Sequence, residues 1–268
     1  MNENWTNIIR DNGIIKINNF LNKEELIDMR DIVNFYSAPK SSKNSYWSVK
    51  YTSLIFKILK LNFVRFKHNL KILELEKKKK IQSIAMSYFS TKCFLNFIDA
   101  YYSPISNNPV IPWHTDQAYH GNKDQIKFAN PEKYFLKIFI YLTDVGPDNG
   151  CMNYIPGSHK IGYAIRDGIF KNKITYSPYW HLADFRAILE KKENRKYFEN
   201  YFRDNSNILV NFLEKTKFIE TNENSKDFDY SLKAGGAIIF DEGGVHRGSK
   251  TLKNDRMVLR YLYSKFKT

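Results

Sequence analysis

The spacing of the hydrophobic residues changes near position 84. Before that point the pattern is mostly helical. Residues 13–17 read as a short apolar strand, and Asn22 followed by Glu25 has the spacing of an N-cap, which predicts a helix from about Lys23 to Tyr36. Apolar residues spaced among the lysines of 52–80 predict one or two amphipathic helices that cover a sheet from outside.

After residue 84 the chain consists of short aromatic and β-branched runs separated by turns, which is typical of strands. We expect strands at 85–88, 94–102, around His114, and at 134–143, 152–155, 228–232, 237–241 and 257–265. Many short strands without alternating helices favour a mainly β fold with flanking helices over a parallel α/β sheet. The expected architecture is a double-stranded β-helix, that is, a jelly-roll or cupin-like barrel.

The strand pattern stops between residues 166 and 226, where a helical, charged and aromatic segment is centred on 184–202. A long insertion in a barrel can cap its mouth and contact substrate, or it can pack on the exterior. The sequence favours both readings equally. No Pro/Gly/Ser-rich linker divides the chain, so we expect one domain over 1–268, with an N-terminal helical region at about 1–83 and a lid-like insertion at about 166–226.

Composition adds few constraints. The 268 residues are 43% hydrophobic, which is enough for a full core. Cys93 and Cys151 form no metal-binding or redox pattern, which suits a reducing, cytoplasmic setting. The first twenty residues lack a secretory signal, and no apolar run is long enough to predict a transmembrane segment.

The formal net charge of +14 is concentrated in one segment. Residues 40–80 hold twelve Lys/Arg against two Glu and end in the run Lys77 to Lys80. This segment is either a solvated face of a lysine-rich chain or a surface that attracts an anionic small molecule, nucleotide or lipid head group.

Three residues have the arrangement of an iron site. His114 and Asp116 are two positions apart, so on an extended strand both side chains point to the same side, and His246 supplies a distant third ligand. Two histidines and one carboxylate occupy one face of an octahedral metal and leave the other face open for a co-substrate and dioxygen. The pattern predicts an oxygenase in which His114, Asp116 and His246 are the metal ligands and the catalytic centre.

The chain resembles the phytanoyl-CoA dioxygenase (PhyH) family of Fe(II)- and 2-oxoglutarate-dependent oxygenases. The resemblance rests on three blocks in family order: 113–117 around the His-x-Asp pair, 142–159 with an Asp-Asn-Gly turn and a Pro-Gly-Ser-His sequence, and 246–249 followed by the strand starting at Arg256. It implies that the enzyme uses Fe(II), 2-oxoglutarate and O2. It also implies that hydroxylation of a C–H bond is coupled to release of succinate and CO2. Because halogenating relatives lack the carboxylate, Asp116 favours hydroxylation, with desaturation or ring closure on the same centre as the alternatives.

The resemblance also implies a basic residue about ten positions after the distal histidine that pairs with the far carboxylate of 2-oxoglutarate. Arg256 has this spacing. Arg260 is the alternative, because residues four apart on a strand face the same side. Ser249 is a candidate donor to the same carboxylate, although Arg247 is an extra residue compared with the expected His-Gly-Ser. Lys137 either faces the co-substrate or points to solvent.

The sequence also allows other interpretations. His159 is expected to hold its turn through hydrogen bonds, and His120 is expected in an exposed loop. The substrate is a small molecule that the sequence leaves unidentified, and the basic segment favours an anionic one. A nucleic-acid-modifying or nucleic-acid-binding protein would use the positive charge, but aromatic and basic residues alternate only at 46–51, which disfavours it. A catalytically silent metal-binding barrel is the third reading, and the intact ligand set argues against it.

Overall fold

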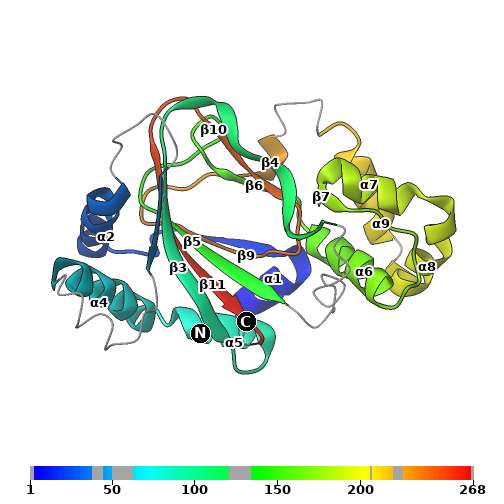
Figure 1. The fold of residues 1–268 in the computed structure, drawn as a ribbon, viewed down its shortest axis with the longest axis horizontal. Coiled ribbons are helices and arrows are strands. Elements are labelled where there is room, and N and C mark those ends of the chain that lie inside the picture. The colour runs from blue at the N-terminus through cyan, green and yellow to red at the C-terminus, as the bar shows by residue number, and fades with distance from the viewer. Residues whose placement is uncertain are drawn as a thin grey trace.

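Two antiparallel β-sheets face each other in this computed structural model, which describes residues 3–37, 45–49, 63–120, 134–205, 207–219 and 226–266 (Figure 1). The larger sheet has six strands in the order β1-β9-β5-β11-β3-β2, and the smaller has five in the order β7-β4-β10-β6-β8. This arrangement confirms the predicted jelly-roll architecture. The strands are β1 Ile14–Ile17, β2 Ser45–Val49, β3 Phe94–Ser103, β4 Ser106–Tyr119, β5 Phe135–Tyr141, β6 Met152–Tyr154, β7 Tyr179–His181, β8 Asp229–Tyr230, β9 Ala237–Asp241, β10 His246–Thr251 and β11 Arg256–Ser264.

Alternating side chains give each central strand two different faces. On β5, Leu136, Ile138 and Ile140 belong to the core between the larger sheet and its helices. Lys137 and Phe139, the residues between them, line a cavity between the two sheets. β11 alternates in the same way. One face of the larger sheet therefore supplies the core, while the other supplies the inner wall of the barrel.

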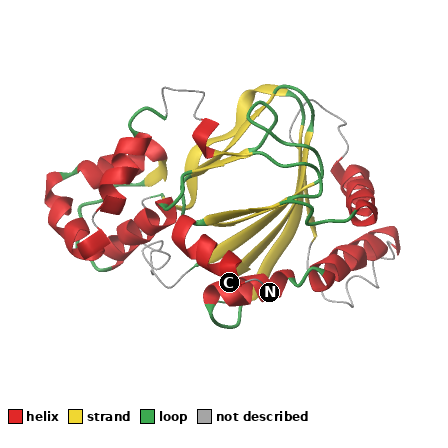
Figure 2. Cartoon of the chain, turned by 180° about the vertical axis from the view of Figure 1, so that it is seen from behind, coloured by secondary structure: helices red, strands yellow, loops and turns green. Residues whose placement is uncertain are grey.

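Helices α1, α2, α4 and α5 cover the outer face of the larger sheet (Figure 2). They span Glu3–Asn12, Lys23–Ser37, Phe63–Lys78 and Ile81–Phe89. The helix expected from Lys23 is present, and α4 accounts for the later part of the predicted 52–80 helices, whose earlier part lies outside the described residues. The predicted strand at 85–88 is wrong. Ile81, Ile84, Ala85 and Phe89 are buried at helical spacing, so this segment packs as α5.

A second group of helices lies beside the smaller sheet (Figure 1). It comprises α6 Ser158–Phe170, α7 Leu182–Glu190, α8 Lys192–Phe202 and α9 Asn207–Thr216, with short 3-10 turns at Arg203–Asn205 and Lys226–Phe228. The helical group begins at Ser158, earlier than expected. At Gly162 a Cβ atom would lie 2.2 Å from the carbonyl oxygen of Gly243, so α6 packs directly on the turn before β10. Within the described residues, no helix has the length and apolarity needed to cross a bilayer.

The start of α2 depends on Glu25. Asn22 Oδ1 accepts a hydrogen bond from the Glu25 backbone N–H at 2.9 Å, and the Asn22 N–H donates to Glu25 Oε2 at 2.8 Å. Lys78 and Lys79 also reach the Glu25 carboxylate, at 2.8 and 2.7 Å. Burial raises the pKa of Glu25, but hydrogen bonds from these lysines and from Asn22 outweigh it and lower the pKa to about 2.

We expect Glu25→Gln to lower the free energy of unfolding by about 1–2 kcal/mol at neutral pH, because it removes a charged partner of the N-cap and of two lysines. The folded-state pKa is depressed, so this stabilisation is present above the unfolded pKa and is lost as the pH falls from about 4.5 toward 2. Urea unfolding of both proteins across this range measures it. Glu24→Gln, in the same turn but exposed, is the matched control. A difference that is independent of pH would contradict the prediction.

Candidate metal and co-substrate site

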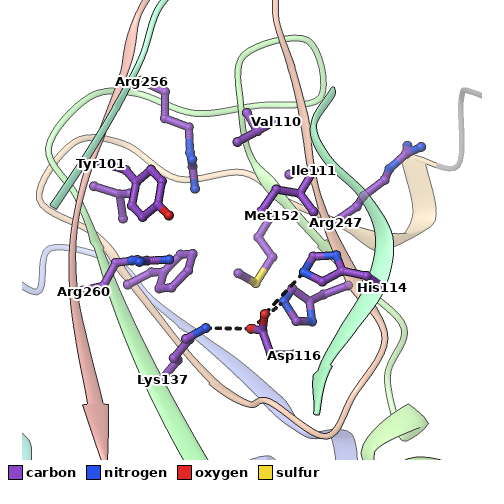
Figure 3. A pocket seen from close by; sticks show the side chains of 14 residues that line it. Tyr101, Val110, Ile111, His114, Asp116, Lys137, Met152, Arg247, Arg256 and Arg260 are labelled. Carbon is purple, nitrogen blue, oxygen red and sulfur yellow. Dashed lines mark hydrogen bonds and ion pairs between the residues drawn. The ribbon is translucent and has the colours of Figure 1, made fainter. Parts of the chain in front are cut away.

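His114, Asp116 and His246 meet on the inner face of the smaller sheet (Figure 3). β4 and β10 are antiparallel neighbours, and their register places His114 directly opposite His246. The two imidazole centroids are 4.4 Å apart. Asp116 follows on the same face of β4, and one ligand atom from each of the three residues lies within 4.8 Å of the others. The structure therefore brings together the three predicted ligands.

Backbone carbonyls orient both imidazoles. His114 Nδ1 lies 2.7 Å from the carbonyl oxygen of Pro112, and His246 Nδ1 lies 3.1 Å from that of Gly244. With Nδ1 as the donor, each Nε2 keeps its lone pair and faces Asp116, as metal-binding histidines require. Position 244 must be glycine for this geometry, because a Cβ there would lie 1.9 Å from the Tyr154 hydroxyl.

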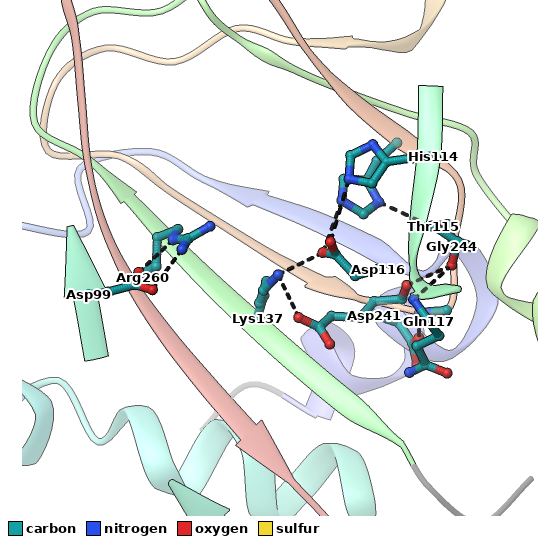
Figure 4. Close-up of polar contacts among 12 residues, drawn as sticks. Asp99, His114, Thr115, Asp116, Gln117, Lys137, Asp241, Gly244 and Arg260 are labelled. Carbon is teal, nitrogen blue, oxygen red and sulfur yellow. Dashed lines mark hydrogen bonds and ion pairs between the residues drawn. The ribbon is translucent and has the colours of Figure 1, made fainter. Parts of the chain in front are cut away.

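Lys137 extends from β5 into the same site (Figure 4). Its Nζ lies 2.6 Å from Asp116 Oδ2 and 2.6 Å from Glu242 Oε1. Burial raises the pKa of Asp116, but Lys137 and His246 hold it well below its ordinary value. Burial and the nearby Asp116 raise the pKa of Glu242 to about 7, even though Lys137 lowers it. Lys137 thus lies at the cavity wall and not in solvent, and its ammonium group bridges the carboxylates of Asp116 and Glu242.

The open side of the three-residue cluster faces a cavity between the sheets. Its apolar lining consists of Tyr101, Val110, Ile111, Phe139, Met152 and Val258. Three cationic side chains also line it: Lys137, Arg256 and Arg260 extend from the larger sheet opposite the histidines (Figure 3). Arg247 borders the cavity from β10, and its guanidinium stacks on Trp113 at 4.8 Å.

Arg256 has an unused donor. It is buried at the start of β11, its guanidinium lies 5.6 Å from the centroid of the Tyr141 ring, and its Nε has no hydrogen-bond partner among the described residues. A buried hydrogen-bond donor without a partner lowers the stability of the folded state. An oxygen atom of a bound ligand could accept the hydrogen bond from Arg256 Nε and remove this cost. This position of Arg256 is compatible with an anchor for a remote carboxylate, and that role stays a prediction.

Arg260 is committed elsewhere. Its Nε and Nη2 donate to the two carboxylate oxygens of Asp99 at 2.6 and 2.7 Å, in the bidentate geometry typical of arginine. Burial lowers the pKa of Arg260, but Asp99 outweighs this effect and raises it above its ordinary value. Arg260 and Arg256 both line the cavity, as the spacing along β11 predicts, but only Arg256 retains an unpaired buried nitrogen.

The Asp-Asn-Gly turn supports Arg256 directly. Gly150 has φ +71°, and a Cβ there would lie 2.6 Å from Arg256 Cδ. Asn149 fixes both sides of the turn: its Nδ2 donates to the Asp144 carbonyl at 2.7 Å, and its Oδ1 accepts from the Asn254 N–H at 2.8 Å. The turn thus holds the loop that connects β10 to β11.

The other predicted residues lie apart from the cluster. Ser249 lies outside the lining of this cavity, with its hydroxyl 3.4 Å from the Gly146 carbonyl oxygen, so the structure does not support the predicted contact with the co-substrate. His159 is buried and contacts the carbonyl of Arg10 through Nε2 at 3.0 Å, so it holds the Pro-Gly-Ser-His turn against α1. His120 is exposed.

The sequence interpretation missed three contributors to the site. Glu242 binds Lys137, Asp99 binds Arg260, and the exposed indole of Trp180 on β7 stands edge-on to His114 at a centroid distance of 5.9 Å. Of these three residues, only Asp99 could have been noticed from the sequence, because a single acid in the apolar run of β3 needs a cationic partner.

The sequence profile of the family described as "Phytanoyl-CoA dioxygenase (PhyH)" matches residues 9–257. The fold and the site are those of the 2-oxoglutarate-dependent oxygenase class. The chain belongs to the phytanoyl-CoA dioxygenase family, whose enzymes use Fe(II), 2-oxoglutarate and O2. This result confirms the resemblance seen in the sequence. No curated protein sequence matches the chain significantly.

Three solved structures similar to this chain share its fold but are distant from it in sequence. HygX from Streptomyces hygroscopicus, with nickel, 2-oxoglutarate and hygromycin B bound, is 14% identical, with a TM-score of 0.55 over 100% of this chain and 89% of its own. EvdO2 from Micromonospora carbonacea var. aurantiaca, complexed with 2-oxoglutarate, is 13% identical, with a TM-score of 0.53 over 98% and 91%. The epimerase SnoN from nogalamycin biosynthesis is 14% identical, with a TM-score of 0.53 over 97% and 81%. These similarities establish the fold alone.

We expect Gly150→Ala to displace Arg256, because the new methyl group would overlap Arg256 Cδ on a backbone that alanine rarely adopts. The expected loss of folding free energy is about 1–3 kcal/mol, accompanied by weaker binding of 2-oxoglutarate. Urea unfolding and anaerobic calorimetry measure the two effects. Gly146→Ala in the same turn is the control, since its Cβ would meet only Ser231 Oγ, at 3.8 Å. Equal behaviour of the two variants would contradict this account of the turn.

Proposed function

We propose that this protein hydroxylates a C–H bond of a small molecule, using Fe(II), 2-oxoglutarate and O2 and releasing succinate and CO2. One observation carries the proposal. Two imidazole Nε2 atoms and a carboxylate converge on one side of a cavity whose opposite wall carries the unpaired Nε of buried Arg256. A metal bound by the first group and a carboxylate bound by the second are the two anchors that 2-oxoglutarate needs.

The side chains have separate tasks. His114, Asp116 and His246 would hold Fe(II), and Arg256 would bind the far carboxylate of 2-oxoglutarate. Lys137 would orient Asp116 through its 2.6 Å contact and compensate its charge. When bound, the iron and co-substrate supply the oxidation, and the protein positions the substrate carbon and excludes water.

Hydroxylation is the finer part of the proposal. Its support is Asp116, which retains the carboxylate that halogenating relatives lack. The fold does not choose the reaction, since SnoN is described as an epimerase.

We also propose that residues 1–268 act as one catalytic domain and that α6 to α9 form the lid. Support for the lid comes from β7, which pairs with β4 at His114 and places Trp180 beside that ligand.

Anaerobic titration of Fe(II)-loaded protein with 2-oxoglutarate tests the proposal. We expect a weak metal-to-ligand charge-transfer band near roughly 500 nm, as this chemistry produces. His114→Ala should abolish the band, because it removes a ligand. Arg256→Met should keep the band at saturation but raise the 2-oxoglutarate Kd by about 100-fold, since a charge-assisted pair contributes roughly 2–3 kcal/mol.

Ser249→Ala serves as the control, because its hydroxyl lies outside the cavity, and it should leave the Kd within about threefold of the wild type, or less than about 1 kcal/mol. Absence of the band in folded, iron-loaded wild type would refute the proposal. A band whose 2-oxoglutarate dependence is unchanged in Arg256→Met would refute the assignment of the anchor.

A further inference from the structure

The cations of the cavity differ in whether an acid already neutralises them. Lys137 is shared between Asp116 and Glu242, and Arg260 is held by both oxygens of Asp99. Asp99 is 1% exposed, so its charge is directed at Arg260 and not at water. Arg256 is the cavity cation whose buried Nε has no partner within the described part of the chain.

Aromatic rings complete the surroundings of Arg260. Its guanidinium carbon lies 4.1 Å from the centroid of the Tyr101 ring and 5.5 Å from that of Phe139. These contacts hold the planar group in place. Its third nitrogen, Nη1, points away from Asp99 and toward the side of the cavity where the histidines lie (Figure 4). Arg260 therefore presents hydrogen-bond donors to the cavity, but its charge is already compensated.

Arg247 does not add a second anion-binding subsite inside the cavity. Its Nε donates to Asn153 Oδ1 at 2.8 Å, its guanidinium stacks on Trp113, and the side chain points away from the cavity (Figure 3). The remaining lining next to the ligand cluster is apolar, with Met152, Ile111 and Val258 among its members.

We propose that Asp99 masks the charge of Arg260, so that Arg256 is the single carboxylate anchor and the part of the substrate that enters the cavity is uncharged, with an oxygen acceptor for Arg260. This inference rests on the proposed function, because it assigns Arg256 to 2-oxoglutarate. A second carboxylate would have to leave water and lie near the neutralised Arg260–Asp99 pair and Asp116 without a cation of its own, which is unfavourable. A hydroxyl, ether or amide oxygen has no such penalty.

The inference reverses the expectation that the basic composition selects an anionic substrate. Most of residues 40–62 lie outside the described part of the chain, and Lys78 and Lys79, at the end of the basic segment, pair with Glu25. These lysines lie at the end of α4, a helix on the outer side of the larger sheet (Figure 1). The cavity is lined by residues from the inner side of that sheet.

Unmasking Arg260 tests the inference without knowledge of the substrate. The Fe(II) and 2-oxoglutarate complex is titrated anaerobically with acetate and with acetamide, a neutral molecule of the same shape, and calorimetry and the charge-transfer band report binding. We expect the wild type to bind acetate no more tightly than acetamide. Asp99→Asn should bind acetate at least about tenfold more tightly than the wild type, and Asp99→Asn/Arg260→Met should lose that gain.

The inference is overturned if the wild type binds acetate as tightly as Asp99→Asn does, if Asp99→Asn gains nothing, or if the gain survives removal of Arg260. Asp99→Asn leaves a buried guanidinium without its acid and can fail to fold. Asp99→Leu/Arg260→Met removes both charges together, a change that proteins tolerate better. It should leave the 2-oxoglutarate Kd within about threefold of the wild type, whereas a loss as large as that of Arg256→Met would overturn the single-anchor assignment.

Failure of this inference and failure of the proposed function give different results. If the wild type forms no charge-transfer band with 2-oxoglutarate, the proposed function itself fails. If the band forms and acetate still binds beside 2-oxoglutarate through Arg260, only the masking by Asp99 is wrong.

Discussion

The register between β4 and β10 is the constraint on which the site depends. It places His114 opposite His246, and the period of the strand then puts Asp116 on the same face. A slip of one residue would turn these side chains to the outer face of the smaller sheet. The glycines around β10 protect this arrangement, because Gly244 and Gly162 allow close approaches to Tyr154 and Gly243 that no larger residue permits. The family motif is thus a packing requirement as well as a set of candidate metal ligands.

Charge pairing decides how the rest of the cavity works. Buried cations are tolerated when acids compensate them, and Glu242 and Asp99 compensate Lys137 and Arg260. Arg256 is different, because the Asp-Asn-Gly turn and Tyr141 position its side chain while leaving Nε unpaired. The stability cost of that unpaired donor is what a bound carboxylate would relieve. Four positively charged side chains therefore border one cavity with different roles.

The helices contribute to the two sides of the barrel in different ways. Those on the larger sheet complete its core and leave the inner face to the cavity. The segment beside the smaller sheet contacts the strands that carry His114 and His246. Helix α6 packs on the turn before β10, and the short strand β7 pairs with β4. Trp180 reaches His114 only because the inserted segment adds this short strand at the edge of the sheet. Substrate recognition by this segment would depend on the same contact.

Strand periodicity, turn chemistry and the motif blocks were enough to predict the barrel, its main strands and the three clustered residues, because the first two are local and the motif blocks are specific. The sequence pattern misread 85–88, where a short apolar run suits either a strand or a helix until packing against the sheet decides. It also left open whether Lys137 faces the co-substrate or solvent, although the alternation of Leu136, Ile138 and Ile140 already placed that residue on the opposite face. The family spacing favoured Arg256 over Arg260, but the contacts that distinguish them depend on tertiary structure: the two share one face of β11, and β3 places Asp99 against Arg260 from far away in the sequence.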